Sequence, residues 1–104
     1  MIVVTSSQVS GKKIVKTLGL VKGNTIRATH LGMDMIAVLK NILGGEISEY
    51  TKLMAEAREQ SLDRMIAMAE GLGANAIVDV QFSTSYIMGN AAEILVYGTA
   101  VKVD

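Results

Sequence analysis

The sequence predicts an α+β fold, an antiparallel sheet with one short and one long helix in the order β-β-α-α-β-β. Three observations predict it. Residues 14–29 are rich in β-branched side chains, residues 46–72 repeat their apolar side chains every three or four positions, and residues 76–103 alternate apolar with polar side chains. At 104 residues, the chain is expected to form a single domain over residues 1–104.

The first third of the chain is expected to supply two strands. The β-branched run Ile2–Thr5 predicts a short strand, and the polar residues 6–13 predict a loop. Residues 14–29 predict a long strand with a bend or bulge near Lys22-Gly23-Asn24, because glycine in a strand often marks an irregularity.

Two helices are expected next. The apolar spacing in residues 31–43 predicts a short helix, which Gly44-Gly45 ends. Residues 46–72 predict a long helix with a polar stripe and a wide apolar face. The main apolar row is Ile47, Tyr50, Met54, Ala57, Ser61, Met65, Met68 and Leu72. A second row is Leu53, Leu62, Ile66 and Ala69, so the face is wide enough to contact both the sheet and a neighbouring subunit.

The last two strands are expected to form a hairpin. Residues 76–86 alternate, with Val78, Val80, Phe82 and Tyr86 on one face. Met88-Gly89-Asn90 predicts the turn. Residues 93–103 then place Leu95, Tyr97, Thr99, Val101 and Val103 on one face.

Composition excludes several classes of function. Ten basic and ten acidic residues give no basic excess for nucleic acid, and the absence of cysteine excludes disulfides and thiolate chemistry. No apolar stretch approaches the ~20 residues that span a bilayer, and the first residues lack a signal-peptide pattern, so a cytoplasmic location is expected. Half of the residues are hydrophobic, which favours self-association of so small a chain.

Several short blocks together resemble the YbjQ-like family of small bacterial proteins, which are labelled heavy-metal-binding. The blocks are Asp34, Gly44-Gly45, Tyr50, Ala57-Arg58-Glu59, Gly73-Ala74-Asn75-Ala76 and Gly98-Thr99-Ala100-Val101. The resemblance spans residues 23–103. It implies a dodecin-like or YbjQ-like subunit that assembles into a homopentameric ring through added strand pairing, with no catalytic residues.

The resemblance also draws attention to the pair Lys40-Asn41. Family members often carry arginine at the first of these positions. Lysine keeps the charge but lacks the planar fork that holds a carboxylate through two hydrogen bonds, so an anion-binding role is weaker in this chain.

Metal binding has few candidate ligands in this sequence. A zinc site usually needs three or four nitrogen, sulfur or oxygen ligands. The single histidine, His30, and the nearby Asp34 are the candidates, and a ring could bring copies of one ligand together on its axis. The alternative is that His30 is an ordinary strand-end residue. The methionines, which could ligate Cu(I), are better explained as packing residues of the long helix.

A small-ligand site has four candidate residues, namely Tyr50, Arg58, Lys40 and Asp34. Tyr50 and Arg58 lie two turns apart on the long helix, where they could line a pocket or hydrogen-bond across a subunit contact. A purely structural role is the alternative. The leading hypothesis is a non-enzymatic homo-oligomer that binds a metal or small ligand at its subunit junctions, and the second hypothesis is an enzyme whose site is shared between subunits.

Overall fold

The computed structural model describes residues 1–28, 46–88 and 91–104. The described elements are β1 (Ile2–Val3), β2 (Ile14–Ala28), α2 (Glu46–Gly71), β3 (Ala76–Met88) and β4 (Ala91–Val103). The α+β class and the long helix are confirmed. The predicted helix over residues 31–43 and the predicted turn at Gly89-Asn90 lie outside the described residues.

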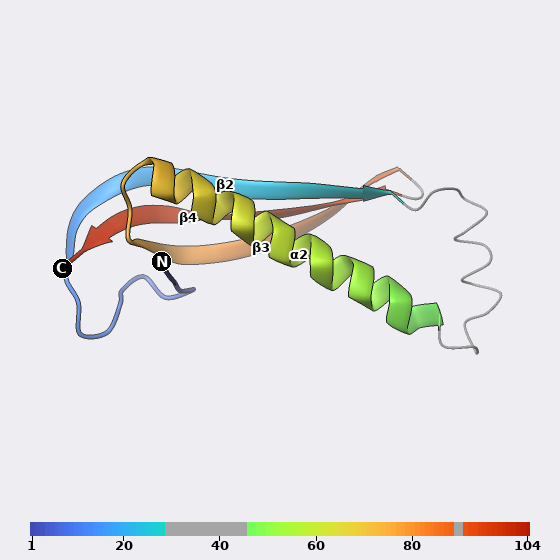
Figure 1. Cartoon of the computed structure of the whole chain (residues 1–104), viewed down its shortest axis with the longest axis horizontal. Helices are drawn as coiled ribbons and strands as arrows, with labels where there is room; N and C mark the ends of the chain where they lie inside the picture. The colour runs from blue at the N-terminus through green and yellow to red at the C-terminus, as the bar shows by residue number, and fades with distance from the viewer. Residues whose placement is uncertain (29–45, 89–90) are drawn as a thin grey trace.

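The four strands form one mixed sheet in the order β1-β3-β4-β2. The long strands pair antiparallel, β2 with β4 and β4 with β3. The prediction of a wholly antiparallel sheet was wrong, because β1 pairs parallel with the start of β3. The loop after β1 returns to the far side of the sheet, so the first strand borders β3 instead of forming a hairpin with β2 (Figure 1).

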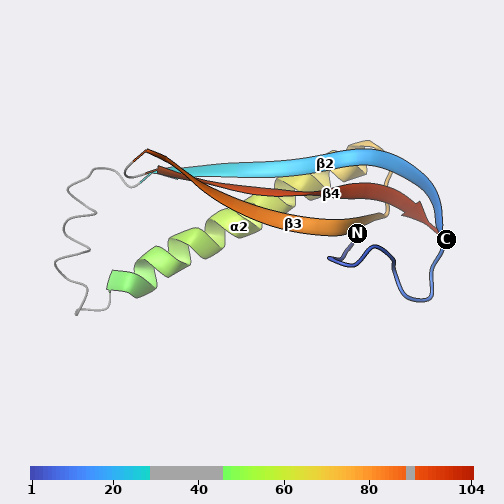
Figure 2. The same cartoon turned by 180° about the vertical axis from the view of Figure 1, so that it is seen from behind.

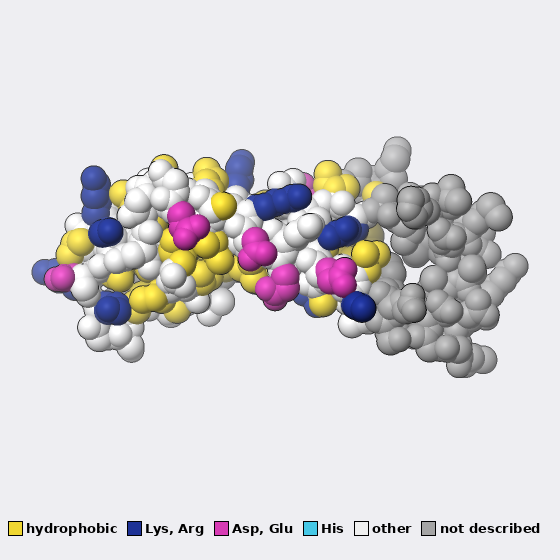
Figure 3. All heavy atoms as spheres, viewed as in Figure 1, with side chains coloured by type: hydrophobic (Ala, Val, Ile, Leu, Met, Phe, Trp, Pro, Cys, Tyr) yellow, Lys and Arg dark blue, Asp and Glu magenta, His cyan; other side chains and the backbone are white. Residues whose placement is uncertain are grey.

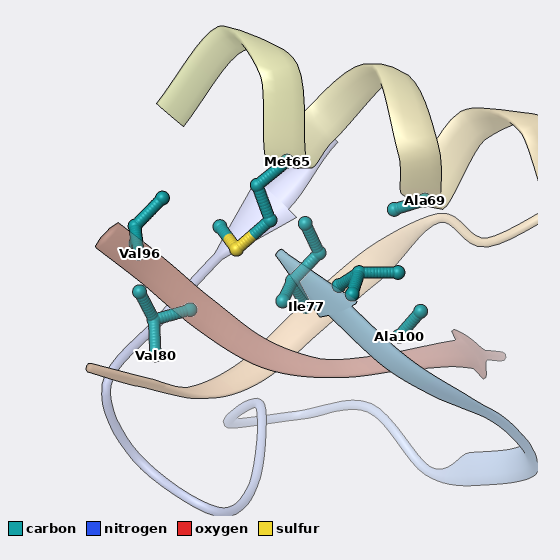
Figure 4. Close-up of a cluster of buried hydrophobic side chains, with 7 residues drawn as sticks. Met65, Ala69, Ile77, Val80, Val96 and Ala100 are labelled. Atoms are coloured by element: carbon teal, nitrogen blue, oxygen red, sulfur yellow. The ribbon is translucent and has the colours of Figure 1, made fainter. Parts of the chain in front are cut away.

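The helix packs on one face of this sheet and diverges from it toward its N-terminal end (Figures 1 and 2). Met65 and Ala69 of α2 meet Ile77, Val80 and Val96 of β3 and β4 in the main core. Figure 4 shows the Met65 side chain reaching down between the strands toward these residues. In the predicted apolar row, Ala57, Ser61 and Met65 are buried, whereas Met68 and Leu72 are 44% exposed.

A second cluster lies on the face of the sheet away from the helix. It joins Ala76, Val78, Val101 and Val103 with partly buried residues of the N-terminal segment. The predicted row from Leu95 to Val103 does share one face of β4, and that face is the one opposite the helix. The N-terminal segment covers only the Val101 and Val103 end of this row. Beneath the helix lie instead the small and branched residues that alternate with that row.

A bulge at Asp79 breaks the alternation predicted for residues 76–86. The pairing with β4 shifts register between Val78 and Gln81, and Asp79 takes a left-handed φ of 54°. As a result Val78 faces away from the helix while Val80 lies in the core under it. The expectation that Val78 and Val80 share a face was therefore wrong.

The predicted bend near Lys22-Gly23-Asn24 was also wrong. Pairing of β2 with β4 runs without interruption from Gly19 to Ala28, and the irregularities lie earlier, between Ile14 and Lys16 and between Thr17 and Gly19. Gly23 has a different function, which is to let the helix approach the sheet closely.

Candidate functional site

The helix contacts the sheet closely around Ser61, a buried polar side chain of α2. Its hydroxyl oxygen lies 2.9 Å from Thr25 Oγ1, 3.0 Å from the carbonyl oxygen of Ala57 and 3.1 Å from that of Ile94. Ser61 is fully buried and Thr25 is 4% exposed. A serine hydroxyl has one proton, so Thr25 can donate to Ser61 while Ser61 donates to a carbonyl. This network joins α2 to β2 and β4.

Gly23 makes that contact possible. A β carbon at this position would clash with the carbonyl oxygen of Ser61 and would lie 2.6 Å from the backbone nitrogen of Met65. Any other residue would therefore push the helix off the sheet. Because Gly23 precedes Thr25 by two residues on the same face of β2, the close approach brings Thr25 within reach of Ser61.

A groove follows the flank of the helix beside the end of β2. Its volume is about 490 Å³, and its lining is Arg27, Lys52, Ala55, Glu56, Glu59, Gln60 and Asp63. Arg27 donates from Nη2 to Gln60 Oε1 at 2.8 Å, and its buried Nε has no hydrogen-bond partner. The groove thus offers carboxylates to a cation and a guanidinium N–H to an anion.

The outer side of β2 is held to the helix by a second arginine. An Nη atom of Arg64 donates to the carbonyl oxygen of Asn24, one strand position from Gly23. Arg27 and Arg64 therefore both bond neutral oxygens of their surroundings, one at each end of the close contact.

A second hollow lies at the N-terminal segment. It also measures about 490 Å³ and is lined by Val4, Ser6, Ser7, Gln8, Val9 and Ser10. The backbone N–H of Asp79 donates to the Ser6 carbonyl at 2.9 Å, so the bulge in β3 helps to hold this loop in place. Its lining carries hydroxyl and amide groups but no charged side chain.

The described structure places only part of the sequence-predicted site. Arg58 is an exposed residue of α2 next to the buried Ala57. Tyr50 lies in the second turn of α2, and its side chain lies outside the described part. Lys40, Asp34 and His30 also lie outside it, so the predicted ligand site and metal site stay predictions. Within the described ranges, no group of three or more His, Cys, Asp or Glu side chains is placed to hold a metal ion.

Sequence reasoning missed Arg27 and Gln60 as partners. One signal was present, because Arg27 occupies the same face of the strand as Val21, Gly23 and Thr25. A cation at the end of a helix-facing row has to find a polar partner on the helix. Which helix residue supplies it depends on the crossing of α2 over the sheet, which the sequence alone does not define.

The fold defines a class of small α+β proteins in which one long helix packs on a sheet of long antiparallel strands. A solved structure from Pediococcus pentosaceus, a protein of the DUF74 family, shares this fold with a TM-score of 0.70 and 14% sequence identity. The alignment covers 100% of this chain and 98% of that one. At this identity the likeness concerns the fold alone.

Sequence comparison defines the family. The chain belongs to the YbjQ family, whose model is described as "putative heavy-metal-binding" and matches residues 1–104. A UPF0145 protein of Dehalococcoides mccartyi strain BAV1 is 57% identical over 104 residues, which is 100% of both chains. A UPF0145 protein of Methanosarcina acetivorans is 52% identical over 103 residues, covering 99% of this chain and 97% of the relative.

These comparisons confirm the predicted family but widen its range, since relatives come from archaea as well as bacteria. They leave the ring assembly and the ligand as predictions. As to membranes, the helix found among the described residues is not apolar enough over a sufficient length to cross a bilayer.

Proposed function

We propose that this protein is a homo-oligomeric binding module, a ring of five subunits joined through the edges of their sheets. The observation that carries the proposal is the outer edge of β2. In the sheet order β1-β3-β4-β2, this 15-residue strand has β4 on one side and no strand of the described chain on the other. Such an edge presents backbone N–H and C=O groups that can pair with another chain.

The side chains along this edge favour a protein neighbour over water. Val15, Leu20 and Ile26 are 55%, 63% and 57% exposed. Natural edge strands are usually protected by charge, proline or a covering element, and β2 carries two exposed lysines, Lys16 and Lys22, beside its aliphatic side chains. An edge with three exposed aliphatic side chains matches the apolar character of an obligate interface.

The other side of the sheet offers a complementary edge. Strand β1 pairs with Ala76 and Ile77, and the backbone N–H groups of Asp79 and Val80 donate to the carbonyl oxygens of Ser6 and Val4. Beyond these contacts, residues 81–88 of β3 border β4 alone within the described chain. Two unlike edges on one subunit can join head to tail, and head-to-tail contacts generate rings when the rotation closes. We propose five subunits because the resemblance to the YbjQ-like family implies a homopentamer.

The junction is where we place a metal or small ligand. The groove that contains Arg27 borders β2, so a neighbour on the β2 edge would help to enclose it. The description of the family supports a metal as one ligand. His30 and Asp34 follow β2 directly in the sequence and are the proposed metal ligands; Tyr50, Arg58 and Lys40 are the proposed ligand-binding residues.

Native mass spectrometry, paired with light scattering, tests both parts. We expect the mass of five 11.1 kDa chains in solution. Replacement of Leu20 and Ile26 by lysine should yield folded monomers, because both side chains are exposed and a charged edge resists pairing. Met68→Lys is the matched control, since Met68 is an exposed apolar residue of the helix. A wild-type monomer at micromolar concentration would refute the ring.

The ligand part has its own readout. Protein isolated without chelators should retain a metal or small molecule in the native spectrum, and His30→Ala should lose the metal without changing the oligomer. Retention of the same metal by the His30 variant would rule out the proposed ligand.

A further inference from the structure

Charge is unevenly distributed in this neutral chain. Residues 1–28 contain Lys12, Lys13, Lys16, Lys22 and Arg27 but no aspartate or glutamate. The helix α2 contains an excess of acidic residues over basic ones. The chain is therefore neutral as a whole, but its first 28 residues are basic and its long helix is acidic.

The basic charge is concentrated at one end of the sheet. We name as the basic tip the four lysines Lys12, Lys13, Lys16 and Lys102. All four are exposed, and Lys16 and Lys102 are cross-strand partners in the pairing of β2 with β4. Like charges directly opposite each other destabilise a sheet. The only acidic side chain in the same turn region is Asp104, whose N–H donates to the Lys13 carbonyl at 2.9 Å.

The acidic charge lies along the back of the helix. We name as the acidic ridge Glu56, Glu59, Asp63 and Glu70, which are all exposed. Their spacing of three, four and seven residues puts them on one side of α2. Ser61, Met65 and Ala69 bind the opposite side to the sheet, so the ridge points away from it. Figure 3 shows the acidic side chains along the helix with basic side chains among them, and a further group of basic side chains at the end of the molecule away from the grey residues.

We propose that the basic tip of one copy docks on the acidic ridge of a second copy. This inference rests on the self-association proposed above and adds the surfaces and the polarity of one contact. One contact between copies would neutralise both patches and would relieve the Lys16–Lys102 repulsion. It is heterologous, since a different surface is used on each copy, and it therefore suits a ring better than a two-fold dimer.

The shape of the ridge supports a lysine-rich partner. Glu56, Glu59 and Asp63 also line the open groove of about 490 Å³, in which three carboxylates face two cationic side chains, Arg27 and Lys52. From Glu56 to Asp63 the helix rises by about 10 Å at 1.5 Å per residue, so two or three ammonium groups can be placed along it. A free inorganic anion would satisfy the tip but would leave the ridge unpartnered.

Charge reversal with rescue tests the contact. The tip variant carries Lys12→Glu and Lys16→Glu, and the ridge variant carries Glu59→Lys and Asp63→Lys. All four positions are exposed. Lys16→Glu also places an acid opposite Lys102, so the variant's own sheet should not be weakened. The matched control is Met68→Glu, which adds an acid at an exposed position of α2 outside both surfaces and away from the β2 edge.

The dissociation constant of the assembly, measured for each variant and for the wild type, tests the contact. The tip and ridge variants should each raise it about tenfold or more, because like charges then face each other. The chain that carries all four substitutions should return to within about threefold of wild type, and Met68→Glu should stay within that range too. Raising salt from about 0.1 to 1 M, which shortens the Debye length from about 10 to 3 Å, should weaken the wild-type assembly.

Four other results would contradict either the contact or the proposed ring. If both variants weaken assembly and the fourfold variant does not recover, the tip and the ridge do not meet. If neither variant differs from Met68→Glu while the wild type assembles, the docking surface is refuted and the proposed ring stands. If the wild type is monomeric at every salt concentration, the proposed function fails first. Binding of inorganic phosphate or a single-stranded oligonucleotide by the tip, without loss of assembly in the tip variant, would assign the lysines to an anion and overturn the contact.

Discussion

Gly23 of β2 faces the carbonyl oxygen of Ser61 in α2 with no space for a β carbon between them. The close approach lets Ser61 reach Thr25 and Ile94 on the sheet. This single contact therefore determines the distance between the two layers of the fold, and it can be tested without any knowledge of the ligand.

Gly23→Ala should destabilise the protein strongly. The added carbon meets backbone atoms of Ser61 and Met65, which cannot rotate away as a side chain can. Overpacking typically costs about 1 to 3 kcal/mol, and we expect the upper end. Chemical denaturation provides the measurement. Gly71→Ala is the control, because a β carbon there meets nothing within 4 Å; an equal loss in both variants would contradict the packing explanation.

Ser61→Ala should lower the free energy of unfolding by about 1 to 3 kcal/mol, because Thr25 loses its buried partner. Thr25→Val alone should also destabilise, since it leaves Ser61 with one partner fewer. In the double variant both hydroxyls are gone, so its loss should be smaller than the sum of the two single losses. Additive losses would show that the two hydroxyls act independently.

Asp79→Gly should be neutral or stabilising. Asp79 has a φ of 54°, and this left-handed backbone costs an ordinary residue roughly 1 to 2 kcal/mol, whereas glycine adopts it freely. Asp79→Val should destabilise by a similar amount, because a β-branched side chain tolerates this region least. Thermal unfolding of the two variants checks the sign, and the order reversed would indicate that the bulge is not strained.

Asn75→Ala should loosen the end of β4. The Asn75 amide donates from Nδ2 to the Val103 carbonyl at 2.9 Å, and its Oδ1 accepts the Val103 N–H at 2.7 Å. Loss of both bonds should cost about 1 to 3 kcal/mol. Asn75→Asp keeps the acceptor and removes the donor, so it should be intermediate near neutral pH. Amide exchange at Val103 is the direct measurement, and unchanged protection in Asn75→Ala would contradict the role.

The sequence was sufficient for the elements whose pattern is local. The long helix begins at Glu46 as predicted and ends within one residue of the prediction. The last two strands were recognised from their alternation, although both extend further toward the turn than expected. The parallel pairing of β1 was not predictable, because it depends on where the loop after β1 takes the chain.

The contacts of the candidate site could not be predicted from local sequence patterns. Ser61 stood in the predicted buried row, yet its partner Thr25 lies 36 residues away in sequence. Arg27 and Gln60 are separated by 33 residues and meet only because the helix crosses β2 at Gly23. Periodicity identifies which face of an element is buried, but it does not give the position of one element along another.

The order of the strands has a consequence for how the chain acquires its structure during synthesis. Strand β2 is made well before its partner β4 (Ala91–Val103), so every pair from Ile14 to Ala28 waits until β4 has been made. Pairing between segments so distant in sequence is slow to nucleate, because the intervening loop must close first. Strand β2, with its exposed aliphatic side chains, therefore stays unpaired on the nascent chain until β4 has been made, and a chaperone that recognises extended apolar segments would find its binding site there.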